Sequence, residues 1–169
     1  MEFRDLIQRR YSVRAYKSVL VEEEKLQQVL EAARLAPTAA NRQAFQLIVI
    51  RTAGREKELR RIYAPEWFAQ APIVIAAVGL PKENWVRRDA RNYVDVDVAI
   101  VVDHLILAAA DLGLGTCWIG AFDPAAAREV LGLPQDAELI IFTPLGYPAD
   151  EPRPKLRRPL SDLVRYEKW

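Results

Sequence analysis

The sequence has very few of the residues on which disulfide frameworks, metal centres and nucleophilic catalysis depend. Its 169 residues include one cysteine and one histidine. Cys117 alone cannot form a disulfide within the chain, and His104 alone cannot build a metal site or a Ser-His-Asp triad. We therefore expect no bound metal, no thiol nucleophile and no Ser-His-Asp triad. Cys117 is predicted to be inert packing, and His104 to be a buried, hydrogen-bonded residue.

The chain also lacks an excess of charge of either sign and lacks a long hydrophobic run. Its 24 basic and 23 acidic residues give a formal net charge of +1, so no global field favours nucleic acid or an anionic membrane. The most apolar segment, residues 98–112, is too short to cross a bilayer and is interrupted by Asp103, His104 and Asp111. With no segment that resembles a signal peptide, we expect a cytoplasmic protein that binds neither nucleic acid nor membrane.

What is present is the composition of one globular unit. The chain is 51% hydrophobic and 28% charged, and its length suits one domain with a real core, so we expect a single α+β domain over residues 1–169. Helical spacing and Val/Ile-rich runs predict the order of its elements. The expected helices begin near residues 3 and 22 and cover 54–63, 98–112 and 124–131; the expected strands cover 45–50, 72–78, 116–119 and 138–144.

Two segments fall outside this regular pattern. Residues 148–159 contain four prolines, which predicts an extended tail outside the compact core that must reach another surface. Its cations, Lys155, Arg157 and Arg158, are either solvated or converge with other cations on one anion. Residues 80–93 are either a solvated connection or a lid over a ligand.

The loop at residues 36–45 is the most informative stretch of the chain. Small residues allow close backbone approach to a ring, while Asn41 and Gln43 each offer a carbonyl acceptor and two N–H donors. Such a loop either serves only to join a helix to a strand or forms hydrogen bonds with the edge of a flat polar ligand. Pro37 ends the preceding helix.

A second candidate site lies at the end of the first helix. Arg10, Ser12 and Arg14 place two fixed charges and a hydroxyl within five residues, and guanidinium groups donate bidentate hydrogen bonds to phosphate oxygens. The alternative is a basic helix end that complements the helix dipole.

The glycine-rich segment at residues 113–120 does not predict a dinucleotide-binding turn. Such a turn follows a strand and opens a helix, whereas these glycines follow a helix. Gly113 is better placed as a helix C-cap, and Gly120 as a point where a backbone N–H approaches a ligand.

Together these segments resemble the motifs of the FMN-dependent nitroreductase family. Residues 10–14 are similar to its RRS-x-R motif, residues 36–45 to its APSA-x-N-x-QPW motif, and residues 112–120 to its LGLGTCWIG motif. The match of residues 155–157 is weaker. Tyr11 stands where the family has Arg or His, and Ala44 where it has Pro.

The resemblance implies a fold, an assembly and a site. The fold would be a central mixed or antiparallel sheet flanked by helices, in an intertwined homodimer whose C-terminal arms, residues 148–169, embrace the partner. FMN would lie at the interface, with Arg10, Ser12 and Arg14 and either Lys155 or Arg157 on its phosphate. Asn41 and Gln43 would meet the ribityl chain and the ring edge, and Thr38 and Ala39 would pack on the flavin from the partner subunit. The backbone of Ile119 and Gly120 would approach N5 and O4. The implied cofactor-binding residues are Arg10, Tyr11, Ser12, Arg14, Thr38, Ala39, Asn41, Gln43, Trp118, Ile119, Gly120, Lys155 and Arg157.

The resemblance also implies a reaction in which the cofactor carries the chemistry. NAD(P)H would deliver hydride to flavin N5 and leave, and a nitroaromatic or quinone acceptor would take its place in a ping-pong cycle that needs no protein nucleophile. Trp85, Tyr93 and Phe122 are candidates for the rim of the acceptor site. The alternatives are flavin cleavage, reductive dehalogenation, or FMN binding without turnover.

Overall fold

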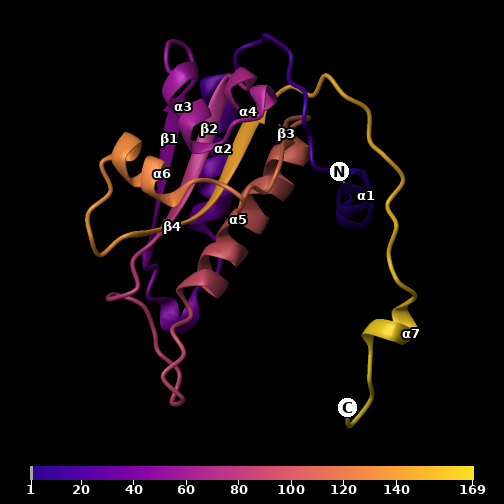
Figure 1. Cartoon of the computed structure of the whole chain (residues 1–169). Coiled ribbons are helices and arrows are strands. Elements are labelled where there is room, and N and C mark those ends of the chain that lie inside the picture. The colour runs from indigo at the N-terminus through magenta and orange to yellow at the C-terminus, as the bar shows by residue number, and fades with distance from the viewer. Residues whose placement is uncertain (1) are drawn as a thin grey trace.

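A computed structural model describes residues 2–169. The chain folds into helices and strands joined by loops, and the C-terminal segment leaves the body of the molecule (Figure 1). In order, the elements are α1 (Phe3–Arg9), α2 (Glu23–Arg34), the 3-10 turn η1 (Ala39–Asn41), β1 (Phe45–Arg51), α3 (Glu56–Ile62), α4 (Glu66–Gln70), β2 (Ile73–Gly79), α5 (Val94–Asp111), β3 (Gly115–Thr116), α6 (Pro124–Leu131), β4 (Glu138–Gly146) and α7 (Leu160–Leu163).

The four strands form one antiparallel sheet in the order β1-β2-β4-β3. Every residue of β2 is buried, which explains why this strand reads as an unbroken apolar run rather than an alternating one. Side chains of a strand point alternately to the two faces. Ile73 and Ile75 accordingly join a core with α2 and α5, while Val74 and Ala76 join a core with α3, α4 and α6.

The predicted α+β fold with a central sheet is confirmed, and most element bounds differ by one or two residues. The helix α6 begins at Pro124 as expected, because the Asp123 carboxylate accepts hydrogen bonds from the N–H groups of Ala125 and Ala126. Gly113, with φ of 76°, follows the last turn of α5 as the predicted cap.

Four elements were predicted imperfectly or not at all. The helix α5 begins at Val94 rather than near residue 98, because the Asn92 side chain accepts the Val94 N–H and starts the helix there. The strand β3 is only two residues long, since Ile119 pairs with Phe142 in an isolated bridge. The short helices α4 and α7 were not predicted, because four or five residues carry too little periodicity to recognise.

The prediction that His104 is buried was wrong. The burial stripe of α5 runs through Val101, Val102 and Leu105, so His104 falls on the opposite side of the helix and is exposed. One ring nitrogen lies 3.1 Å from the carbonyl oxygen of Ile100. Cys117 is buried, as predicted.

The C-terminal segment leaves the body of the molecule and runs along one side of it (Figure 1). Residues 151–159 have no regular structure and are exposed, which confirms the predicted extended tail outside the core. Across residues 2–169, no helix combines the length and the apolar character that a membrane span requires.

Candidate functional site

The segment after α1 is extended, and this conformation brings three predicted site residues onto one face. Ser12 pairs with Thr116 of β3, and the Val13 N–H donates to the Thr116 carbonyl at 2.9 Å. Side chains of an extended chain alternate in direction. Val13 is therefore buried in the core, while Arg10, Ser12 and Arg14 share the outward face.

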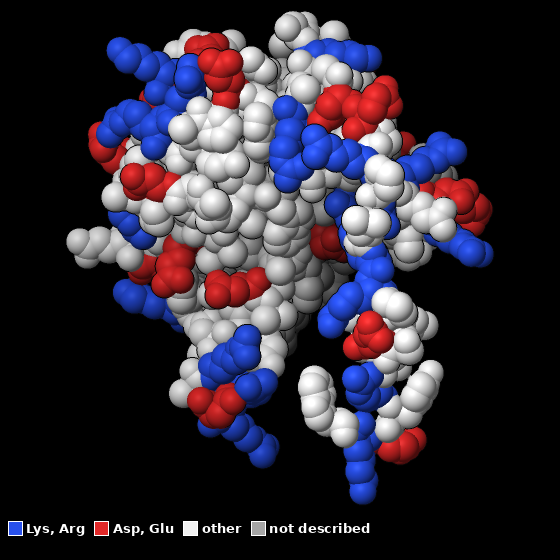
Figure 2. All heavy atoms as spheres, turned by 45° about the vertical axis from the view of Figure 1, so that its right-hand side comes forward, with Lys and Arg blue, Asp and Glu red and all other residues white. Residues whose placement is uncertain are grey.

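The C-terminal segment crosses this face and closes a cavity of about 590 Å³. Arg10, Ser12 and Arg14 line one side of it, and Lys155 and Arg157 line the other. The structure thus brings together the two cationic clusters whose convergence the sequence left open. Figure 2 shows Lys and Arg side chains gathered where the C-terminal segment leaves the body and continuing along it.

Asp150 holds the C-terminal segment in this position. Its carboxylate accepts the Arg14 backbone N–H at 2.8 Å, and the Tyr11 hydroxyl donates to the Asp150 carbonyl at 2.7 Å. Burial and the neighbouring Asp150 carboxylate raise the pKa of Tyr11 to about 12, so the hydroxyl keeps its proton and remains a donor. Tyr11 therefore positions the tail. Sequence analysis missed Asp150, which carries no local motif.

Lys155 joins the tail to α1. Its ammonium donates to the carbonyl oxygens of Ile7 and Gln8, both at 2.6 Å, in the last turn of the helix, where cations are favoured. Burial lowers the pKa of Lys155, and so does repulsion from Arg10 and Arg157. Asp150 and Glu151 line the same cavity, but its cations outnumber them: Arg10, Arg14, Arg153, Lys155 and Arg157. A bound anion would compensate the excess positive charge.

The loop at residues 38–43 holds an unusual backbone conformation. Ala40, Asn41 and Gln43 have φ of 50°, 53° and 54°, in the left-handed region that residues other than glycine adopt at a cost. The Gln43 N–H donates to the Thr38 hydroxyl at 3.0 Å, which closes the loop on itself. The side chains of Asn41 and Gln43 are exposed and can face a ligand.

A buried carboxylate anchors this loop to α5. Asp97 is 2% exposed, and its Oδ1 accepts the Ala39 N–H at 2.9 Å. No described residue gives a hydrogen bond to its other oxygen, Oδ2. Sequence analysis missed Asp97, whose only signal is an acidic residue in the first turn of an apolar helix.

We expect Asp97→Ala to destabilise the protein by about 1–3 kcal/mol, because it leaves the Ala39 N–H without its acceptor. Asp97→Asn retains an acceptor oxygen and should cost less. Urea unfolding of both variants measures the difference. Equal losses in the two variants would mean that the contact with Ala39 does not hold the loop.

The two groups of candidate residues lie at opposite ends of α5. Arg10 and Tyr11 line a small cavity with Ala110 and Gly113 at its C-terminal end, whereas the loop is bonded to its first turn. A helix of 18 residues is about 27 Å long. In Figure 1, likewise, the turn between α2 and β1 lies at the bottom and the segment after α1 rises to the top. One chain does not bring both groups onto one small ligand.

The backbone groups of residues 118–120 differ in whether they have hydrogen-bond partners. The Ile119 N–H donates to the Phe142 carbonyl at 2.9 Å and the Ile119 carbonyl accepts the Phe142 N–H at 3.0 Å, so the expectation that Ile119 offers its backbone to a ligand is corrected. Within residues 2–169, no acceptor engages the Gly120 N–H. Trp118 is 38% exposed beside it.

The remaining chemistry of the site is limited. In the part of the chain that the structure describes, no group of three or more His, Cys, Asp or Glu residues is placed to hold a metal ion. Burial raises the pKa of the Cys117 thiol, so it is not an activated nucleophile. The arrangement can bind an anion and a flat polar group, but it offers no acid/base pair of its own.

The chain is similar to known proteins along most of its length. The nitroreductase family model matches residues 7–67 and 61–147. The crystal structure of a nitroreductase family protein from Clostridium difficile 630 is 39% identical and superposes with a TM-score of 0.90, covering 100% of both chains.

Two further relatives have names that include a cofactor. The FMN reductase [NAD(P)H] of Bacillus subtilis is 29% identical over 94% of this chain and 70% of its own length. An FMN-dependent nitroreductase of Clostridium difficile R20291 is 27% identical, covers 97% of this chain and 98% of its own, and has a TM-score of 0.81. With the family model matched along most of its length, the chain belongs to the nitroreductase family.

Proposed function

We propose that the protein is a cytoplasmic, homodimeric, FMN-dependent oxidoreductase that moves hydride from NAD(P)H to a nitroaromatic, quinone or similar acceptor in a ping-pong cycle. The observation that carries the proposal is the cavity in which Arg10, Ser12 and Arg14 meet Lys155 and Arg157. FMN and NAD(P)H are in the names of relatives that align with nearly the whole chain.

The residues of the cavity fit the phosphate of FMN. Guanidinium groups on two sides can hold a dianion through charge-assisted hydrogen bonds, and Ser12 adds a hydroxyl donor. Among residues 2–169, the Arg14 guanidinium donates only to the Ser12 carbonyl, at 3.3 Å, so most of its donors remain available to a ligand. Burial, and after it repulsion from Arg10 and Arg157, lowers the pKa of Lys155; a bound anion would offset the repulsion.

The loop at residues 38–43 supports a site that two chains complete. This loop lies about the length of α5 away from its own chain's cavity, so it would serve the cavity of a partner subunit. A twofold axis makes this exchange reciprocal and gives two equal sites. In each site, Thr38 and Ala39 would pack on the ring while Asn41 and Gln43 would bond its polar edge.

The protein's part in the reaction is then to bind and to orient. When bound, FMN supplies the hydride transfer itself. The Gly120 N–H would stabilise negative charge on the ring edge, as would the cations of the cavity. No side chain has to give or take a proton at the reacting atom.

Cys117→Ala and His104→Asn are therefore each expected to retain most of the rate of flavin reduction by NAD(P)H. Removing the small buried thiol should cost about 1–2 kcal/mol of stability, and the exposed His104 less. Stopped-flow bleaching of the bound flavin measures the rate. A hundredfold fall in a folded, FMN-saturated variant would identify that residue as catalytic.

The experiment that tests the proposed function is the visible spectrum of the purified protein before and after anaerobic NADH or NADPH. We expect a flavin spectrum that bleaches with either reductant and returns when a nitroaromatic is added. Bound FMN that neither reductant bleaches would indicate a binding protein without turnover. Protein that does not bind added FMN would refute the assignment of the phosphate cavity.

A further inference from the structure

The segment between β2 and α5, residues 80–93, forms a hydrogen-bonded hairpin rather than an irregular loop. Val86 pairs with Asn92, the Arg87 N–H donates to the Arg91 carbonyl at 2.9 Å, and Ala90 turns the tip with φ of 66°. The Asn92 amide also donates to the Pro81 carbonyl at 2.8 Å and secures the base. In Figure 1 the hairpin extends below the body of the molecule.

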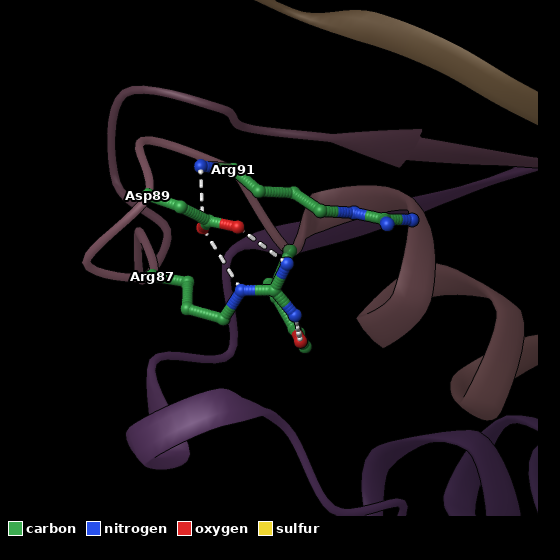
Figure 3. Close-up of polar contacts among 4 residues, drawn as sticks. Arg87, Asp89 and Arg91 are labelled. Atoms are coloured by element: carbon green, nitrogen blue, oxygen red, sulfur yellow. Dashed lines mark hydrogen bonds and ion pairs between the residues drawn. The ribbon is translucent and has the colours of Figure 1, made fainter.

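One arginine of the hairpin is fully engaged in its architecture. The Arg87 guanidinium donates to both carboxylate oxygens of Asp89, at 2.9 and 2.6 Å, and to the Tyr93 hydroxyl at 2.7 Å (Figure 3). It also lies over the Tyr93 ring, 5.5 Å from its centre. Arg87 is therefore neutralised and stiffens the tip.

Beyond Arg87, the tip carries two more arginines but only one carboxylate, that of Asp89, which is already bonded to Arg87 and has only an electrostatic interaction with the Arg91 side chain. Arg88 and Arg91 are exposed, and among the described residues neither guanidinium has a hydrogen-bond or ion-pair partner. In Figure 3 the Arg91 side chain extends away from Asp89, although its backbone N–H approaches that carboxylate. A stiff tip that carries two uncommitted guanidinium groups suits a phosphate, because each group can donate two parallel hydrogen bonds.

Aromatic rings lie at the base of the same hairpin. Trp85 and Tyr93 form an edge-to-face pair with ring centres 5.0 Å apart, and both are only half-buried. A strand rises about 3.3 Å per residue, so the tip at Arg88 lies about 10 Å beyond Trp85. The hairpin therefore offers a ring-stacking surface and, further out, a phosphate-binding tip.

The hairpin is attached to the loop that is proposed to hold the flavin edge. The Leu80 N–H donates to the Ala44 carbonyl at 3.0 Å, directly after that loop. Asp97, which binds the Ala39 N–H, donates its own N–H to the Tyr93 carbonyl at 2.9 Å. NADH and NADPH each carry an adenosine at the end opposite the nicotinamide. If the nicotinamide lies on a flavin held by this loop, the hairpin is the neighbouring segment that the adenosine can reach.

We propose that Arg88 and Arg91 bind the 2′-phosphate of NADPH and make NADPH the preferred reductant over NADH. This inference rests on the proposed function. The 2′-phosphate is the one chemical difference between the two reductants. A site formed by these two guanidinium groups therefore discriminates between them, because the groups gain a dianion with NADPH and nothing with NADH.

The test is the reductive half-reaction of the FMN-loaded protein, followed by stopped flow at fixed ionic strength. For the natural protein we expect an apparent Kd for NADPH at least tenfold lower than for NADH. In the double variant Arg88→Gln, Arg91→Gln, the Kd for NADPH should rise about tenfold or more while that for NADH changes less than twofold. Arg60→Gln, on α3 and outside the hairpin, is the matched control and should change neither.

Competition with 2′,5′-ADP supplies a second readout. It should inhibit reduction of the natural protein and lose this effect in the double variant. An unchanged ratio of the two Kd values in a folded, FMN-loaded double variant overturns the proposal, and so does an equal rise for both reductants. If neither reductant bleaches the natural protein, the proposed function itself is wrong, and the hairpin assignment fails with it.

Discussion

A chain that ends at Arg158 is expected to be monomeric or aggregated and to have lost FMN, although every residue of its phosphate cavity is still present. The deleted segment carries exposed apolar side chains, with Leu160 at 73% and Tyr166 at 84%. Exposed apolar groups of this size indicate a surface that another molecule covers. If the arm reaches a partner subunit, its loss removes the dimer and with it the second half of each site.

A chain that ends at Pro148 is the companion variant. It also loses Asp150, which binds Tyr11 and the Arg14 N–H, and the Lys155 bonds to α1. We expect the same loss of dimer and FMN, together with lower stability. Sedimentation velocity and FMN content measure both variants. A chain ending at Arg158 that stays dimeric and holds FMN would contradict an exchanged arm.

Replacing Arg14 with alanine is expected to weaken FMN binding by tenfold or more without unfolding the protein. A hydrogen bond to a charged group contributes about 1.5–3 kcal/mol, and 1.4 kcal/mol corresponds to a factor of ten. The fold should persist, because Arg14 is exposed and binds Asp150 through its backbone N–H, which alanine keeps.

Flavin fluorescence titration measures this affinity. Arg34→Ala is the control: Arg34 is an exposed arginine of α2 whose ion pair with Glu31 joins neighbouring helical turns, and its loss should leave the affinity unchanged. Arg14→Lys should fall between the two, since lysine keeps the charge but not the bidentate geometry. Equal FMN affinity in the natural protein and the Arg14→Ala variant would show that Arg14 does not bind the phosphate.

The features that sequence predicted well are those determined within a few residues. The cap at Asp123, the turn at Gly113 and the buried run of β2 each follow from local propensity and the hydrogen-bonding capacity of adjacent residues. The motif resemblance extended this local information to the family and its fold.

The features that sequence did not predict depend on residues far apart in the chain. The bonds between Tyr11 and Asp150 and between Ala39 and Asp97 have no local signature. Nor could the sequence show that the Ile119 N–H donates to the Phe142 carbonyl of β4. The prediction that His104 is buried was wrong for a related reason. The packing of the sheet and α2 decides which side of α5 faces solvent.

The same limit applies to the site as a whole. The sequence places Arg14 and Asn41 in motifs of one family, and that resemblance implies that a partner subunit contributes to each flavin site. Local sequence patterns by themselves do not show how far apart the two motifs lie in one chain. The structure puts their segments at opposite ends of α5. The central claim is therefore that each FMN site takes its phosphate residues from one subunit and its ring residues from the other.

The most direct test is the FMN content of a purified heterodimer in which one chain carries Arg14→Ala and the other carries Asn41→Ala, Gln43→Ala. Ala40 shows that alanine can adopt the positive φ of this loop, and circular dichroism of the variant carrying Asn41→Ala and Gln43→Ala checks that the fold persists despite the cost of that conformation. If the two chains share each site, both defects fall in the same site, and the other is intact, so about one FMN binds per heterodimer. A heterodimer that binds none, while a natural chain paired with a chain carrying all three substitutions binds one, would show that each chain builds its own site and would contradict the account.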